Sequence, residues 1–216
     1  MIRVHDRYRL ELAGDDVFYA KTSFGPKGMA PRFEIPQWTR CMIPRWLNGA
    51  YKMHRFSRPD DGGTVDFTPA GGHRYVEWTL AKGEAACIDL RKLVGFSGSV
   101  TLRSKISLRL SAFAMNRISY TIALGPGLVV METTGIPEVF RSAGECRPFP
   151  PSRLIAWSAD SSFGLSLATG RFSHYLSPTY LTALETRGVL LDADDPKSNS
   201  KGFLTKMVRR IYSPFG

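Results

Sequence analysis

The sequence contains little cysteine and no long apolar run, and these shortages exclude several classes of protein. Its three cysteines, Cys41, Cys87 and Cys146, are widely spaced and form no CxxC pair, so neither a disulfide framework nor a cysteine-based zinc site is indicated. This usage fits a reducing compartment, and we expect a cytoplasmic protein. The longest run without a charged residue, Ile118 to Met131, is too short for a transmembrane helix. Acidic Asp6 near the start also argues against a secretory signal.

Motifs for metal, phosphate or nucleophilic chemistry are missing as well. The four histidines form neither an HxH nor an HxxxH pair, and the glycine patterns of nucleotide-binding loops do not occur. The segment Gly95-Phe96-Ser97-Gly98-Ser99 comes near a nucleophile elbow but lacks its glycine spacing, so we expect a turn. Cys87 follows two alanines and precedes an isoleucine, which is typical of a small buried apolar residue. The sequence therefore predicts no catalytic residue, no metal site and no cofactor.

The net charge of +10 lies at the two ends of the chain. Residues 1–60 hold eleven Lys and Arg against six Asp and Glu, residues 61–195 hold thirteen of each, and residues 196–216 hold five basic and no acidic residues. Net charge bears on solubility and on non-specific attraction before it bears on fold. Any electrostatic partner is therefore expected at the terminal segments and not on the neutral middle.

From residue 64 onward, apolar and polar residues alternate with a period of two, which predicts half-buried β-strands. The strongest such segment is 100–110, where Val100, Leu102, Ile106, Leu108 and Leu110 share one face. Segments 75–80 and 118–124 repeat the pattern, with Ile122 and Leu124 on the apolar face of the latter, and glycine and proline clusters separate the strands. The sequence predicts an all-β fold, either a β-sandwich or a related barrel.

The chain also repeats itself. Gly83-Glu84 followed by residues 92–97 recurs as Gly144-Glu145 followed by residues 153–158, at a constant offset of 61. Upstream elements led by Gly63, Gly127 and Gly188 are spaced by 64 and 61 residues. We therefore predict about three copies of one β unit of roughly sixty residues, stacked to bury a shared face.

The repeated Gly-Glu element, its continuation in residues 93–96 and 154–157, and the segment Leu124–Met131 resemble the altered inheritance of mitochondria protein 24 family. The resemblance covers about residues 48–195. It implies a β-sandwich built from repeats, like the fold of the tryptophan RNA-binding attenuator protein. Mitochondrial members of that family are linked to inner-membrane organisation. The resemblance supplies no catalytic residues, and the first sixty residues do not match the family's pattern.

We expect a single β-sandwich domain over residues 1–195 that includes an irregular, proline-rich N-terminal arm over residues 1–47. Residues 196–216 form a basic tail, in which apolar residues recur at helical spacing with cations between them. Such a short amphipathic helix can lie on an anionic membrane surface, or it can dock on the protein itself or on a partner. The residues expected to make this contact are Lys201, Phe203, Leu204, Lys206, Met207, Val208, Arg209, Arg210 and Ile211.

A second candidate surface is the polar face of the long strand, where Arg103, Lys105 and Arg109 project together. With Tyr75, Tyr120 and Phe113 available for stacking, these residues could bind RNA. The balanced charge of the middle of the chain argues against this interpretation.

The sequence thus predicts a non-catalytic, homo-oligomeric β scaffold or binding protein that uses its terminal segments to engage a membrane surface or a larger protein assembly. Two alternatives remain open: an RNA-binding regulatory protein, and a small-ligand-binding protein or enzyme with a cleft between repeats.

Overall fold

The computed structural model groups the chain into two compact units. Unit 1 comprises residues 1–105 and 120–137, and unit 2 comprises residues 106–119 and 138–216. The structure describes residues 1–12, 16–23, 32–37, 42–47, 50–57, 64–69, 71–106, 119–145, 147–167 and 179–193. The sequence analysis expected one domain over residues 1–195, so each unit is described by itself.

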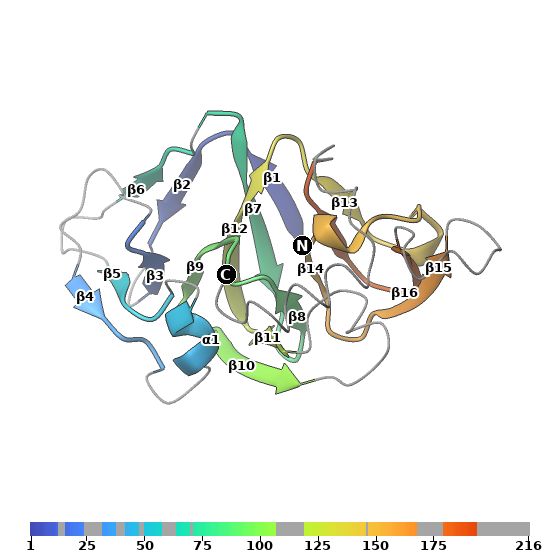
Figure 1. Cartoon of the computed structure of the whole chain (residues 1–216). Helices are drawn as coiled ribbons and strands as arrows, with labels where there is room; N and C mark the ends of the chain where they lie inside the picture. The colour runs from blue at the N-terminus through green and yellow to red at the C-terminus, as the bar shows by residue number, and fades with distance from the viewer. Residues whose placement is uncertain are drawn as a thin grey trace, which may run out of the picture. The chain divides into compact units, whose positions relative to one another are not determined.

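Unit 1 is built on a seven-stranded antiparallel sheet (Figure 1). The long strands β7 and β12 pair over eight residues, from His73 opposite Thr134 to Leu80 opposite Gly127. The strand β3 lies in the interior of the sheet, between β9 and β5. In spatial order the strands are β1 (Ile2–His5), β7 (His73–Leu80), β12 (Gly127–Thr134), β9 (Leu93–Ser97), β3 (Val17–Lys21), β5 (Met53–Ser57) and β4 (Arg32–Glu34).

An aromatic core covers one face of this sheet. The two-stranded sheet of β2 (Tyr8–Glu11) and β6 (Thr64–Phe67) supplies Tyr8 and Phe67, whose rings lie 6.1 Å apart. Phe67 also contacts Phe18 of β3 and Tyr75 of β7, with ring centroids 6.0 Å and 6.5 Å away. Edge-to-face rings at these distances stabilise a core beyond their area burial. The expected all-β sandwich is therefore the fold of the chain.

A third group of strands in unit 1 follows the order β10 (Thr101–Ile106), β11 (Ser119–Leu124) and β8 (Ala85–Ile88). In β10, Leu102 is buried and Arg103 is exposed, as the alternation predicts. In β11 the expected face is wrong: Thr121 and Ala123 are buried, whereas Ile122 and Leu124 are half-buried. Small residues fill this face because β11 pairs with β8, where Ala123 lies opposite the equally small, fully buried Ala86.

Unit 2 contains the remaining strands. β14 (Leu154–Ser158), β17 (Val189–Leu191) and β13 (Glu138–Phe140) are neighbours in that order, and β15 (Ser162–Leu167) pairs with β16 (Thr179–Glu185). Two single-turn 3-10 helices, η1 (Ala143–Glu145) and η2 (Pro151–Arg153), precede β14. The ring of Phe163 lies 6.2 Å from those of Phe149 and Trp157, which gives unit 2 an aromatic cluster of its own.

The same strand pair occurs once in each unit, 60 to 61 residues apart. In unit 1, Phe96 and Gly95 lie opposite Val129 and Val130, and the register then shifts so that Leu93 lies opposite Met131. In unit 2 the corresponding pairs are Trp157 with Val189 and Ala156 with Leu190, followed by the same shift to Leu154 with Leu191.

Hydrogen bonds at the end of each pair match as well. The Glu132 amide donates to the Lys92 carbonyl at 2.8 Å, and the Asp192 amide donates to the Arg153 carbonyl at 2.7 Å. Equal bulges and equal closing bonds explain the offset of 61 in the sequence by one shared backbone geometry. The number of copies, three, stays a prediction.

The structure corrects the expectation of an irregular N-terminal arm over residues 1–47. This segment contributes β1 to β4 and the short helix α1 (Met42–Leu47). The strand β3 was missed because it is short and pairs on both sides, with Phe18, Ala20 and Lys21 all buried, so it shows little polar alternation. The predicted C-terminal helix and the end of the segment 100–110 lie outside the described residues.

The interior position of β3 depends on a glycine in β9. Gly95 lies opposite Ala20, and a Cβ at this position would clash with the Tyr19 carbonyl oxygen and come within 2.5 Å of Cε1 of Phe18. The backbone of β3 cannot move away from this clash without breaking its pairing with β9. Glycine is therefore required here for close approach and not for a special φ.

We expect Gly95→Ala to lower the free energy of unfolding by about 1–3 kcal/mol, the usual cost of overpacking a core. Gly71→Ala is the matched control, since a Cβ there meets nothing within 4 Å. Urea unfolding of the two variants and the wild type measures the difference. Equal stability of the two variants would contradict the role given to Gly95.

Candidate functional site

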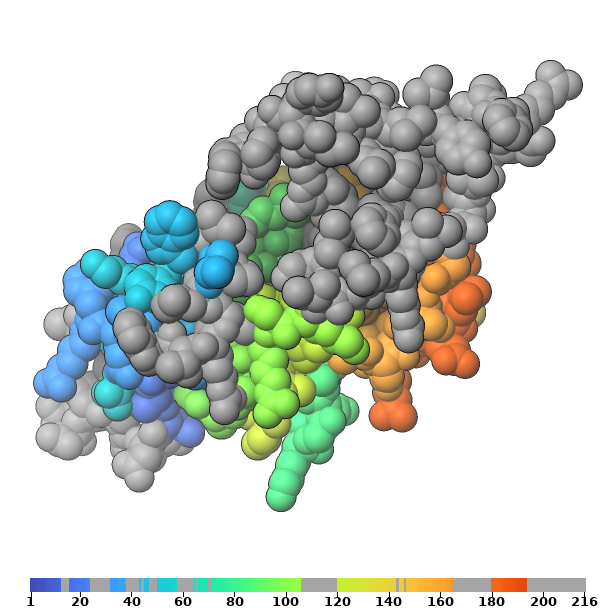
Figure 2. All heavy atoms as spheres, turned by 60° about the horizontal axis from the view of Figure 1, so that its bottom comes forward, coloured from blue at the N-terminus to red at the C-terminus, as the bar shows by residue number. Residues whose placement is uncertain are grey.

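Three exposed apolar side chains lie at the β4 end of unit 1, and we call Phe33, Ile43 and Trp46 the edge surface. Their exposed fractions are 71%, 66% and 68%. Phe33 is the middle residue of β4, and its ring contacts the His54 ring on β5 at 4.8 Å. Ile43 and Trp46 are three residues apart on α1, a spacing that places them on one side of the helix. Figure 2 shows the residues of β4 and α1, in blue tones, at the surface of the molecule.

The helix α1 is held in place by a buried arginine. Arg45 is 1% exposed, and its guanidinium donates to the Ala50 carbonyl at 3.0 Å and to the Pro36 carbonyl. Its other terminal nitrogen lies 4.0 Å from Sδ of Met53 on β5. The planar fork of an arginine can bind several carbonyls at once, which fixes their relative positions. Arg45 thus joins α1 to the residues that follow β4, so the edge surface is presented on fixed backbone.

Ionic groups surround the edge surface on the neighbouring strands. The Glu34 carboxylate accepts hydrogen bonds from the Tyr19 hydroxyl at 3.3 Å and from Arg55 at 3.1 Å. Arg32 is exposed and lies directly opposite Arg55 in the β4–β5 register. Like charges in such a pair repel one another.

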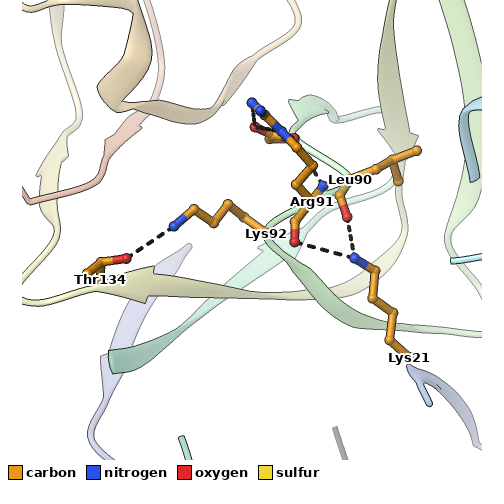
Figure 3. Close-up of polar contacts among 6 residues, drawn as sticks. Lys21, Leu90, Arg91, Lys92 and Thr134 are labelled. Carbon is orange, nitrogen blue, oxygen red and sulfur yellow. Dashed lines mark hydrogen bonds and ion pairs between the residues drawn. The ribbon is translucent and has the colours of Figure 1, made fainter. Parts of the chain in front are cut away.

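A second unusual position is Lys21, at the end of β3 (Figure 3). Its ammonium group is buried, with 4% of the residue exposed, and donates to the Leu90 carbonyl at 2.5 Å and the Arg91 carbonyl at 3.4 Å. Burial lowers the pKa of Lys21 to about 8, against the opposing attraction of Asp89 and Glu132. Desolvation penalises the charged form of a buried lysine, which accounts for the direction of the shift.

Lysines with a lowered pKa serve as nucleophiles in some enzymes. The Lys21 amine is instead directed at main-chain carbonyls of the turn between β8 and β9, where Asp89 also pairs with Arg91 at 2.7 Å. Beyond this turn, Lys92 donates to the Thr134 hydroxyl on β12 at 3.2 Å. Lys21 therefore ties β3 to the turn that begins β9, a structural role.

The histidines of the described residues lie apart from one another. His73 approaches Glu132 at 3.1 Å and His5 approaches Glu77 at 3.7 Å, while His54 is buried between the rings of Phe33 and Phe56. Burial lowers the pKa of His54. In the part of the chain that the structure describes, no three His, Cys, Asp or Glu residues come together as a metal site would require.

The remaining residues weighed for chemistry have structural environments. Cys87 is buried, and desolvation raises its pKa to about 12, which disfavours the reactive thiolate. Ser97 lies in the expected turn, where its hydroxyl accepts the Leu128 amide at 2.9 Å and so fastens the end of β9 to β12.

The two predicted surfaces are only partly visible. Arg103 and Lys105 are exposed on β10, as expected. Tyr75, considered for base stacking, is instead buried in the aromatic core, because β2 and β6 cover its face of the sheet. Arg109, Phe113 and every named residue of the tail lie outside the described residues. Of the described helices, none has the length and apolar character needed to cross a membrane.

Sequence reasoning missed Lys21, Arg45 and the edge surface. Nothing in the sequence distinguishes Lys21 from a surface lysine at a strand end, because its partners are main-chain carbonyls about 70 residues away. The spacing of Ile43 and Trp46 was a usable signal, but a six-residue helix containing Pro44 is too short for periodicity to indicate.

Comparison with known proteins agrees with this fold and adds no activity. No family model and no curated protein matches the chain. Among solved structures, the chain is similar to protein SPYM3_0169 from Streptococcus pyogenes, a structural-genomics target, with a TM-score of 0.60 and 10% identity over 98% of this chain and all of that one. At this identity the likeness shows a shared fold alone.

The lowered pKa of Lys21 predicts a specific pH dependence of stability. The unfolded chain binds this proton up to pH 10.5 and the folded chain only up to about 8, so the contribution of Lys21 to stability rises with pH across that interval. We expect the difference in unfolding free energy between wild type and Lys21→Met to grow by about 3 kcal/mol from pH 8 to 10.5, at 1.36 kcal/mol per pKa unit.

Urea unfolding at stepped pH values measures this difference. Lys82→Met, at an exposed turn position, is the control and should follow the wild type at every pH. Because Tyr8, Tyr75 and Cys87, whose raised pKa values also affect stability at alkaline pH, are present in all three proteins, their effects cancel. Parallel curves for wild type and Lys21→Met would show that the burial of the ammonium group has no such effect.

Proposed function

We propose that this protein is a non-catalytic, oligomeric β scaffold that holds protein partners at its surface. The observation that carries the proposal is the edge surface, where three large apolar side chains more than 60% exposed stand on backbone fixed by Arg45. Exposed apolar residues that cluster, and are not scattered singly, mark interaction sites. Unpaired edges of a sheet are a second route to association.

The likeness to the altered inheritance of mitochondria protein 24 family belongs to this proposal. The strand pair that recurs at an offset of 60 to 61 residues supports a fold assembled from repeats, and the Streptococcus pyogenes neighbour supports the fold class. A repeated β unit whose copies differ mainly at their surfaces suits a scaffold, because its loops and edges can vary while the shared core is kept.

The RNA-binding alternative has weaker support. Arg103 and Lys105 offer exposed cations on one strand, but stacking platforms are a main source of affinity for single strands, and Tyr75 is buried in the core. We therefore favour a protein partner over a nucleic acid.

Oligomerisation is tested by size-exclusion chromatography with light scattering at micromolar concentration. We expect the wild type to be larger than a monomer and the pair Ile43→Ser and Trp46→Ser, made together, to shift the mass toward the monomer by removing apolar contact area. Leu184→Ser is the matched control, since this side chain is 61% exposed on β16 of unit 2. A wild type that is strictly monomeric would overturn the proposed function.

The basic tail is a separate part of the proposal, based on the sequence pattern of residues 201–211. Flotation with vesicles containing anionic lipid should recover the full chain and lose most of a chain lacking residues 197–216, because each cation near the headgroups adds about 1 kcal/mol. Neutral vesicles are the control. Equal recovery of both chains would remove the membrane from the proposal and leave protein partners.

A further inference from the structure

The seven-stranded sheet ends in two different edge strands. Among the strands described, β1 is the last on one side and β4 the last on the other. β4 has three residues, Arg32, Phe33 and Glu34, and it pairs with β5 through Arg32 opposite Arg55, Phe33 opposite His54 and Glu34 opposite Met53. An edge strand presents backbone groups that another strand can pair with.

The sequence of β4 is complementary to itself. If a second copy of β4 pairs antiparallel about a two-fold axis at Phe33, Arg32 of each copy lies opposite Glu34 of the other, and the two Phe33 side chains face each other. A two-fold interface always brings one surface against the same surface of the second copy, so such self-complementarity is what it requires. Opposite charges in cross-strand pairs stabilise the pairing.

The surroundings of Arg32 favour this arrangement. Arg32 lies beside Arg55, and the Glu34 carboxylate of its own chain accepts a hydrogen bond from Arg55 at 3.1 Å. One carboxylate thus stands near two guanidinium groups at this edge. The Glu34 of a second copy would place a carboxylate directly opposite Arg32 and reduce the repulsion between Arg32 and Arg55.

The other edge offers no such match. In β1 the sequence Ile2-Arg3-Val4-His5 has one permanent charge, and its histidine already approaches Glu77. Antiparallel pairing about Arg3 would set two arginines opposite each other, and pairing about Val4 would set Arg3 opposite His5. The apolar residues that could pack beside a paired edge, Ile43 and Trp46, belong to α1, which Arg45 joins to the residues after β4.

We propose that two copies of this chain associate through β4, antiparallel about a two-fold axis at Phe33, with Arg32 of each copy paired to Glu34 of the other. The inference rests on the proposed oligomeric function and assigns its interface. Ile43 and Trp46 flank the paired strands and become covered on association.

Charge exchange tests this geometry. Arg32→Glu alone sets two carboxylates opposite each other across the interface, and Glu34→Arg alone sets two guanidinium groups opposite each other, so each variant should associate at least tenfold more weakly than the wild type. When the two variants are mixed, both cross-strand pairs become complementary again, and mixed dimers should form with near wild-type affinity. Arg103→Glu, the same charge change at an exposed strand position, should leave association unchanged.

Thermal unfolding of each variant checks that it folds, since Glu34→Arg also removes the contacts with Tyr19 and Arg55. If that variant does not fold, Phe33→Cys replaces it: mild oxidation should give a disulfide between two copies of residue 33, identified by mass spectrometry of the linked peptides. Wild-type oligomers that persist in both charge variants, or an oxidised Phe33→Cys dimer lacking this linkage, would overturn the β4 interface and leave the oligomeric scaffold standing. A monomeric wild type would overturn both.

Discussion

The pairing of β3 with β9 is the contact on which the rest of unit 1 depends. β3 lies against β9 on one side and β5 on the other, so β5 and β4 belong to the sheet only through it. Two devices secure this pairing. Gly95 lets the backbones approach without a clash, and the Lys21 ammonium bonds the carbonyls of the turn that begins β9. A buried ammonium costs desolvation energy, so it is retained where its hydrogen bonds fix a geometry that an apolar residue could not specify.

The comparison of the two recurring strand pairs indicates which features belong to the scaffold and which to one unit. Both pairs keep the bulge and the closing hydrogen bond from the second strand to the residue before the first. They differ at the residue beside the bulge, which is Gly95 in unit 1 and Ala156 in unit 2. The smaller residue stands where β3 approaches, so a single methyl group separates a position that must accept this strand from one that keeps a side chain.

The sequence predicted what periodicity and repetition can reveal. Segments 75–80 and 118–124 became β7 and β11, the turn at residues 97–99 and the burial of Cys87 were as expected, and the offset of 61 corresponds to a recurring strand pair. Short strands paired on both sides gave no such signal, which is why β3 was assigned to an irregular arm. The edge surface depends on which strands become neighbours, and only Arg45 and the register of β4 with β5 bring Phe33, Ile43 and Trp46 to one end of the sheet.

The charges on β4 also bear on why an open edge need not lead to indiscriminate aggregation. Natural edge strands are often protected by charged residues and by shortness, and β4 has both. Its two charges are opposite in sign and two residues apart, so only one antiparallel register with another β4 sets each charge against its complement. A shift of two residues either way sets Arg32 against Arg32 or Glu34 against Glu34, which like-charge repulsion disfavours. The same two side chains can thus reject slipped pairings and permit a single closed one, and closure about a two-fold axis uses the edge up and prevents further growth.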